Sequence, residues 1–252
     1  MMLECRSVSK YFGGVKAVRD CSLKVDEHAI VGLIGPNGAG KTTLFNVVAG
    51  VFPATSGEVF FKGEKISGLP AWQIAGRGIA RTFQTPHGFP LMTVMENLMV
   101  APLDQAGDGL LRGLVGGGKV ARQDTENHDK AMRLLESIGL MEYRNELVVN
   151  LSAGDARLVE MIRQLMLNPS ILLLDEPAAG INPALTGHLL ALLRKLRQDG
   201  LTILAIDHNL GFMMELCDYI YVLALGRVIA QGTPDEIIRD PLVIQAYLGK
   251  SA

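Results

Sequence analysis

Residues 35–43 of this 252-residue chain have the composition and spacing of a phosphate-binding loop, with glycines followed by a lysine and two threonines. Glycines allow successive backbone N–H groups to approach phosphate oxygens closely, because no Cβ stands in the way. Lys41 supplies a cation for the β- and γ-phosphates, and the hydroxyl of Thr42 is a ligand for Mg2+. We therefore predict that this loop binds a nucleoside triphosphate through Gly35, Pro36, Asn37, Gly38, Ala39, Gly40, Lys41, Thr42 and Thr43.

Two adjacent carboxylates, Asp175 and Glu176, follow the apolar run 171–174. Parallel-sheet proteins bind ligands at the carboxyl ends of their strands, so both acids are expected to face the phosphates. Mg2+ keeps several waters beside substrate phosphates, which makes Asp175 its expected partner through water. Glu176, one residue on, is the candidate that polarises an attacking water. An aspartate that merely caps a helix is the structural alternative for Asp175.

The elements that must position these residues alternate between strand and helix. An apolar run at 29–34 predicts a buried strand before the loop, and residues 42–49 predict a helix after it. Short apolar runs at 171–174, 201–206 and 220–225 are typical of further buried parallel strands. This alternation predicts an α/β core around a parallel sheet.

The apolar period becomes helical between about residues 87 and 167. Apolar stripes within 131–138 and 158–166 predict two amphipathic helices. Residues 104–124 carry several glycines and few large apolar side chains, which indicates a mobile insertion. We expect this stretch to form a helical lobe inserted into the α/β core.

Composition narrows the function classes. The formal net charge is −2, with no basic footprint for nucleic acid. No apolar run approaches the roughly 18 residues that a membrane span requires. Cys5, Cys21 and Cys217 lie far apart, and the first residues lack the apolar stretch of a signal peptide. We therefore expect a soluble intracellular protein with reduced core thiols, unable to cross a bilayer alone.

A Leu-Ser-x-Gly segment at 151–154 opens the second predicted helix. Together with Lys41 and the Asp175-Glu176 pair, in this order along the chain, it resembles the nucleotide-binding subunit of ATP-binding cassette (ABC) transporters. The resemblance covers essentially the whole chain. It implies an ATPase that uses ATP and Mg2+.

The resemblance also implies a fold and its division. The expected fold is α/β, a P-loop NTPase core with a mainly parallel sheet, an N-terminal antiparallel β subdomain and an inserted helical subdomain. Residues 1–252 would form one ABC ATPase domain. Its core and antiparallel subdomain would occupy 1–86 and 168–252, and its helical subdomain 87–167.

In that family the Leu-Ser-x-Gly helix start belongs to the ATP site of the partner subunit. The resemblance therefore places Ser152, Gly154 and Asp155 at the partner's ATP site, where Ser152 and the backbone N–H of Gly154 would contact the γ-phosphate. A serine-capped helix is the plain alternative. The commonest family signature is Leu-Ser-Gly-Gly-Gln followed by Gln, and Ala153, Asp155 and Ala156 depart from it. Asp155 in the first helical turn is favourable by about 0.3–1 kcal/mol. Because its charge would repel a triphosphate, we expect its carboxylate to point away from the γ-phosphate.

Three more positions take roles from the same resemblance. Gln84 matches the glutamine that senses Mg2+ and the attacking water. His208, after the run 201–206, matches a histidine that contacts the γ-phosphate. Phe12 matches the aromatic residue that stacks on adenine. Without the family, these would be a surface glutamine, a structural histidine and a core phenylalanine.

Longer segments, such as Arg-Thr-Phe-Gln at 81–84 and the sequence near the C-terminus, resemble the ATP-binding subunits of branched-chain (hydrophobic) amino acid importers. The insertion at 104–124 favours the larger, G-type paralogue. This implies a second ABC ATPase subunit, identical or paralogous, and two transmembrane permease subunits. It also implies an indirectly coupled solute-binding protein outside the membrane and no nucleic acid. The chain would lie peripherally on the cytoplasmic face of the cell membrane.

Phe89 and Met92, within 84–97, are candidate anchors for the permease, with packing inside the helical lobe as the alternative. The transported solute stays open, since amides, urea or aromatic acids are possible beside branched-chain amino acids. A soluble cassette ATPase of translation or DNA repair is the competing function. A non-catalytic regulatory cassette is disfavoured because the loop and Glu176 are intact.

Overall fold

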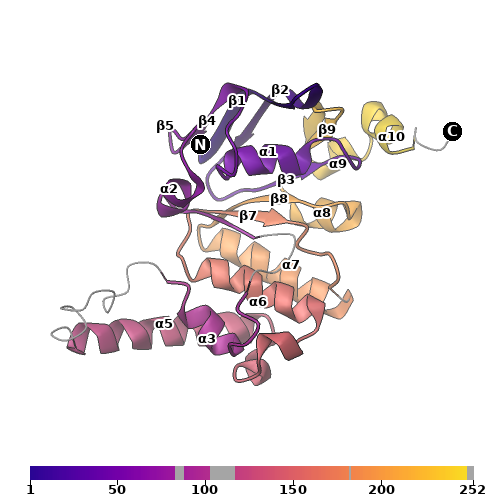
Figure 1. The fold of residues 1–252 in the computed structure, drawn as a ribbon. Coiled ribbons are helices and arrows are strands. Elements are labelled where there is room, and N and C mark those ends of the chain that lie inside the picture. The colour runs from indigo at the N-terminus through magenta and orange to yellow at the C-terminus, as the bar shows by residue number, and fades with distance from the viewer. Residues whose placement is uncertain (83–87, 103–116, 182, 249–252) are drawn as a thin grey trace. The chain divides into compact units, whose positions relative to one another are not determined.

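The computed structural model describes residues 1–82, 88–102, 117–181 and 183–248. The chain divides into two compact units (Figure 1). The core unit comprises Met1–Arg81, Ser170–Ala179 and Leu193–Ala252, and the helical unit comprises Thr82–Pro169 and Gly180–Leu192. In the described part of the chain, no helix is long and apolar enough to cross a membrane.

The core unit is built around a six-stranded sheet with the strand order β10-β9-β3-β8-β7-β6. The four neighbouring pairs from β9 to β6 in this order are parallel, whereas β10 pairs with β9 in the antiparallel direction. The strands are β3 (Ile30–Ile34), β6 (Ile79–Arg81), β7 (Ile171–Asp175), β8 (Thr202–Ile206), β9 (Tyr219–Ala224) and β10 (Arg227–Gly232). Every residue of β3, β7 and β8 is buried, which explains why these strands are continuous apolar runs in the sequence.

A second sheet in the core unit is antiparallel and has the strand order β2-β1-β4-β5. Its strands are β1 (Leu3–Phe12), β2 (Val15–Val25), β4 (Ser56–Phe61) and β5 (Glu64–Lys65). Buried and exposed residues alternate along much of β1 and β2, as expected for strands with one face in the core. The N-terminal antiparallel sheet expected from the sequence is therefore present, and it joins β1 to β4 as well as to β2.

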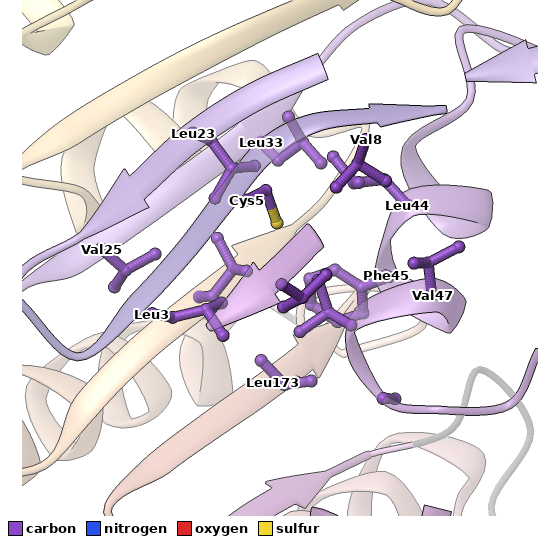
Figure 2. Close-up of a cluster of buried hydrophobic side chains, with 14 of the residues drawn as sticks. Leu3, Cys5, Val8, Leu23, Val25, Leu33, Leu44, Phe45, Val47 and Leu173 are labelled. Atoms are coloured by element: carbon purple, nitrogen blue, oxygen red, sulfur yellow. The ribbon is translucent and has the colours of Figure 1, made fainter. Parts of the chain in front are cut away.

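Helix α1 (Lys41–Val48) lies between the two sheets, and its apolar side chains join both (Figures 1 and 2). Phe45 is completely buried in this cluster, together with Leu3 of β1 and Leu173 of β7. Figure 2 shows these side chains and Cys5 pointing into one shared volume. The remaining helices of this unit are α2 (Ala71–Gly76), α8 (Leu210–Leu216), α9 (Pro234–Ile237) and α10 (Pro241–Leu248). Thr233 and Glu236 form a capping box at the start of α9.

The helical unit contains α3 (Val94–Met99), α5 (Gly117–Ser137) and α6 (Ala153–Leu165), which pack against one another. Two single 3-10 turns, Met141–Tyr143 and Val148–Asn150, connect α5 to α6. The last long helix, α7 (Pro183–Gln198), runs from this unit into the core unit. Buried residues of α6 include Leu158, Met161, Ile162 and Leu165, which are members of the predicted apolar stripe.

The prediction of a mobile insertion at 104–124 is wrong for its last part, because α5 begins at Gly117. Residues 103–116 lie outside the described residues. The glycines at 116–118 favour a loop, whereas the residues that follow them favour a helix. Arg122 and Glu126, one helical turn apart, form an ion pair at 2.8 Å on this helix.

Candidate functional site

The predicted phosphate-binding loop connects β3 to α1, as the strand–turn–helix pattern requires. Gly35, Gly38 and Gly40 all have positive φ angles, of 149°, 79° and 102°. A Cβ at Gly35 would lie 2.1 Å from the carbonyl oxygen of Leu223, and a Cβ at Gly40 would lie 2.3 Å from that of Ala17. These two positions therefore require glycine both for their backbone angles and for the space around them.

Lys41 turns back into this loop. Its Nζ donates hydrogen bonds to the carbonyl oxygens of Gly35 at 2.7 Å and Pro36 at 3.2 Å. Burial lowers the pKa of Lys41, while the nearby carboxylates of Glu176, Asp175 and Asp207 act in the opposite direction. The ammonium group is thus held at the loop, surrounded by carbonyl oxygens and by acids that favour its charged form.

Asp175 ends β7 and is only 3% exposed. Arg81, the last residue of β6, donates a hydrogen bond to its Oδ2 at 3.1 Å and another to Oδ1 of Asn46 at 2.5 Å. Thr42 lies in the first turn of α1 and is exposed. One side of the loop therefore has a hydroxyl, and the neighbouring strand end has a carboxylate.

Glu176 follows β7 in a left-handed conformation, with a φ angle of 50°. Its backbone N–H donates to the carbonyl oxygen of Ile206 at 2.7 Å, which ties the end of β7 to the end of β8. Its Oε1 lies 3.7 Å from Nδ1 of His208, and the histidine side chain is mostly exposed. Non-glycine residues rarely adopt positive φ angles, and such strain is concentrated at functional sites.

Asp207 supports this arrangement from within the protein, because it is 1% exposed and lies between Ile206 and His208. Its carboxylate accepts hydrogen bonds from the backbone N–H of Ala178 at 3.1 Å and of Asn209 at 2.9 Å. The loops after β7 and β8 are therefore fixed to one another. Since β3, β8 and β7 are neighbours in the sheet, the phosphate-binding loop, His208 and Glu176 meet at its carboxyl edge.

Phe12 ends β1 in the same unit, and 46% of its surface is exposed. Its ring packs edge-on against Phe52 at a centroid distance of 5.3 Å. Nζ of Lys10 lies 5.1 Å from its centroid. The exposed aromatic surface agrees with a stacking role, which stays a prediction.

In the helical unit, Ser152 is the N-cap of α6. Its hydroxyl accepts a hydrogen bond from the backbone N–H of Asp155 at 3.2 Å and donates one to Oδ2 of Asp155 at 2.7 Å. Gly154 is buried, and a Cβ there would lie 3.0 Å from the carbonyl oxygen of Gly180. The Asp155 carboxylate therefore engages the same hydroxyl that was predicted to meet a partner's γ-phosphate.

Gln84 lies outside the described residues. No role was predicted from the sequence for Arg81, Asn46 or Asp207. The signal for Asp207 was available, since it follows an apolar strand as Asp175 does. Arg81 and Asp175 are 94 positions apart in the chain, so no local sequence pattern predicts their contact.

The residues of the core unit fit ATP with Mg2+. A Cβ at Gly38 would find nothing within 4 Å, so the tip of the loop is an open turn of backbone. No group of three or more His, Cys, Asp and Glu side chains gathers around a metal position in the described ranges. Mg2+ does not need such a cluster, because one or two carboxylates and the substrate phosphates usually hold it. Thr42 and Asp175 would hold it here.

A separate apolar cavity of about 470 Å3 is lined in part by residues 36–39 of the phosphate-binding loop. It lies between the loop, the β9–β10 turn and α10. Its lining includes neither Lys41 nor the acidic residues of the sheet edge. Burial raises the pKa of Tyr247 in α10 to about 12, and the backbone of Gly35 counteracts part of this effect. The C-terminal helix is thus a neighbour of the phosphate-binding loop.

Comparison with known proteins gives two family matches. Residues 18–179 match the ABC transporter family, and residues 227–252 match the C-terminal family of branched-chain amino acid ATP-binding cassette transporters. The second match covers β10, α9 and α10.

Similar proteins extend over nearly the whole chain. The high-affinity branched-chain amino acid transport ATP-binding protein LivG of Salmonella typhimurium is 44% identical over 99% of this chain and 98% of its own length. The corresponding protein BraF of Pseudomonas aeruginosa is 42% identical, with the same coverage. Among solved structures, a nucleotide-free ATP-binding cassette has a TM-score of 0.84 at 34% identity, covering 99% of both chains. The ADP conformation of a cassette has a TM-score of 0.82 at 32% identity, again over 99% of both chains.

Proposed function

Because the chain belongs to the ABC transporter family, we propose that it is the ATP-binding and ATP-hydrolysing subunit of an importer for branched-chain or related amino acids. The observation that carries the ATPase assignment is the meeting of Lys41, Glu176 and His208 at one edge of the sheet. The cargo assignment is supported by the relatives, which are named for branched-chain amino acid transport over the same length.

In this proposal the core unit holds the nucleotide. Phe12 stacks on the adenine, the backbone of residues 35–43 surrounds the phosphates, and the Lys41 ammonium moves from its carbonyl partners to phosphate oxygens. Thr42 and Asp175 would hold Mg2+, which would supply positive charge to neutralise the phosphates. Gln84 is the further residue proposed to sense that ion.

Glu176 then orients and polarises the attacking water, with its Oε1 3.7 Å from Nδ1 of the exposed His208. His208 contacts the γ-phosphate from the loop that follows β8. The bond from the Glu176 N–H to Ile206 fixes the backbone from which the carboxylate projects. Positioning of this kind, rather than covalent chemistry, supplies most of the rate in phosphoryl transfer.

The proposed partners are a second ATPase subunit and two transmembrane permeases, with a solute-binding protein acting through them. An apolar patch on the helical unit, defined by Phe89, Leu91, Leu147 and Val149, supports permease binding. All four side chains are exposed. The backbone N–H of Val149 donates to the Pro90 carbonyl at 3.0 Å, which holds the two segments of the patch together. Exposed apolar groups of this kind mark interaction sites.

A Glu176→Gln variant tests the ATPase assignment. It keeps the shape of the side chain and removes the carboxylate, so ATP binding should persist while hydrolysis falls by at least about 100-fold. Turnover is measured as phosphate release and binding with a fluorescent ATP analogue. An undiminished turnover would remove Glu176 from the water-activating role.

Uptake tests the cargo. The chain is tagged in its host, solubilised in detergent with its associated membrane subunits, and reconstituted in liposomes with its solute-binding protein. Labelled leucine should accumulate with ATP and should not accumulate with the Glu176→Gln variant. Accumulation of another solute alone would correct the cargo, whereas recovery of the chain only with ribosomes or DNA would refute the transporter assignment.

A further inference from the structure

Arg81 connects three elements of the core unit at the metal-facing side of the proposed ATP site. It is the last residue of β6, and its side chain is 10% exposed. One terminal nitrogen donates to Oδ2 of Asp175 at 3.1 Å, and the other donates to Oδ1 of Asn46 at 2.5 Å. The guanidinium carbon also lies 5.6 Å from the centroid of Phe45, which is buried.

The two acceptors of this guanidinium lie on the two elements that carry the proposed Mg2+ ligands. Asp175 ends β7, whereas Asn46 lies on α1. Asn46 is four residues after Thr42, so both lie on one side of that helix. Arg81 therefore spans from the side of α1 that carries the threonine to the strand end that carries the acid.

The chemistry of arginine suits this task. Its planar fork directs two donors in fixed directions, whereas a lysine offers one flexible point charge. A carboxylate as deeply buried as that of Asp175 also requires a cationic or hydrogen-bonding partner. If Arg81 only compensated the buried charge of Asp175, its contact with Asp175 would be enough. The second bond, to Asn46, indicates that Arg81 also positions Asp175 relative to α1.

We propose that Arg81 is a positioning residue for Mg2+–ATP, acting through Asp175 and Asn46 rather than on the nucleotide. It fixes the separation and orientation of the Asp175 carboxylate relative to Thr42. This inference rests on the proposed ATPase function. It assigns Arg81 to the metal-dependent part of binding, because Asp175 is the proposed metal partner and Asn46 lies on α1, beyond the loop that surrounds the phosphates.

The test compares binding of a fluorescent ATP analogue with EDTA and across a Mg2+ titration. In Arg81→Met the Kd in EDTA should stay within about twofold of that of the unchanged protein, because Lys41 and the loop are intact. The Mg2+ concentration that produces half of the change in analogue binding should rise at least about tenfold. Arg81→Lys should recover part of this shift, since it keeps one charged donor. The matched control is Arg77→Met, whose exposed side chain pairs with Glu64 at 3.7 Å and donates to the Gln73 carbonyl at 3.4 Å.

An unchanged Mg2+ midpoint in a folded Arg81→Met protein would overturn the proposal, and so would an equal loss of affinity in EDTA. Should that variant not fold, Asn46→Ala decides the question, because it keeps the Arg81–Asp175 pair and removes only the link to α1. A raised midpoint in Asn46→Ala supports positioning, and an unchanged one refutes it. If the unchanged protein binds no nucleotide, the proposed function itself fails, which is a distinct result.

Discussion

The left-handed backbone at Glu176 leads to a stability prediction that separates strain from catalysis. A residue with a Cβ in this conformation costs about 1–2 kcal/mol, whereas glycine adopts it freely. Glycine in turn gives the unfolded chain extra freedom, which costs about 0.4–1 kcal/mol. Comparing Glu176→Gly with Glu176→Ala cancels the lost carboxylate, since both variants lack it and both keep the N–H bond to Ile206.

The net difference should favour glycine by about 0.5–1 kcal/mol. For a chain of this size that corresponds to an increase in Tm of about 1–4 °C for Glu176→Gly over Glu176→Ala. Differential scanning calorimetry measures the two Tm values, and phosphate release confirms that both variants have lost turnover. Ala191→Gly, inside α7, is the control with ordinary helical backbone. It should lower stability by about 1 kcal/mol, which is the opposite sign.

A Glu176→Ala protein as stable as Glu176→Gly would refute the argument that the site stores backbone strain. The result in the predicted direction would show that position 176 is occupied by a residue chosen for activity at the expense of stability.

Three further predictions concern single side chains. Lys41→Ala should weaken ATP-analogue binding by at least tenfold both with and without Mg2+, and an unchanged Kd would contradict the phosphate role of Lys41. Asp155→Ala releases the Ser152 hydroxyl and removes a negative charge from the start of α6. In a Glu176→Gln background it should therefore increase the ATP-dependent dimer seen by size-exclusion chromatography, whereas an unchanged or smaller dimer fraction would argue against signature contact with a partner. Lys130 donates hydrogen bonds to the Leu165 carbonyl and Asn168, and burial lowers its pKa to about 8. Between that value and the usual lysine range, the unfolded chain binds the proton that the folded chain has lost, so stability should rise with pH across this window. Urea unfolding should show the rise to be smaller in Lys130→Met, and equal slopes would contradict it.

Much of the site follows from local sequence because its geometry is local. The glycines at 35 and 40 predict a tight turn, and the turn between β3 and α1 has positive φ angles at both. Likewise, continuous apolar runs predict buried strands, and the carboxyl end of such a strand is a defined place at which Asp175 must lie.

What sequence reasoning missed depends on contacts distant in the chain or on mixed local signals. Arg81 reaches Asn46 across 35 positions and Asp175 across 94, so its role requires knowing that β6 and β7 are neighbours. The start of α5 was missed because glycines and helix formers overlap at 117–124. The hydrogen bond between Ser152 and Asp155 was not foreseen, although an acid in the first turn of α6 was expected.

The three thiols have a practical consequence. Cys5, Cys21 and Cys217 are all buried, and burial raises the pKa of each, to about 12 for Cys21. Because the thiolate is the reactive form, maleimide dyes should not label these three cysteines in the folded protein. Cysteines introduced at the exposed Trp72 and Asp129 would then accept donor and acceptor dyes without background. Since one lies in the core unit and the other in the helical unit, energy transfer between them would follow the distance between the units during each ATP cycle.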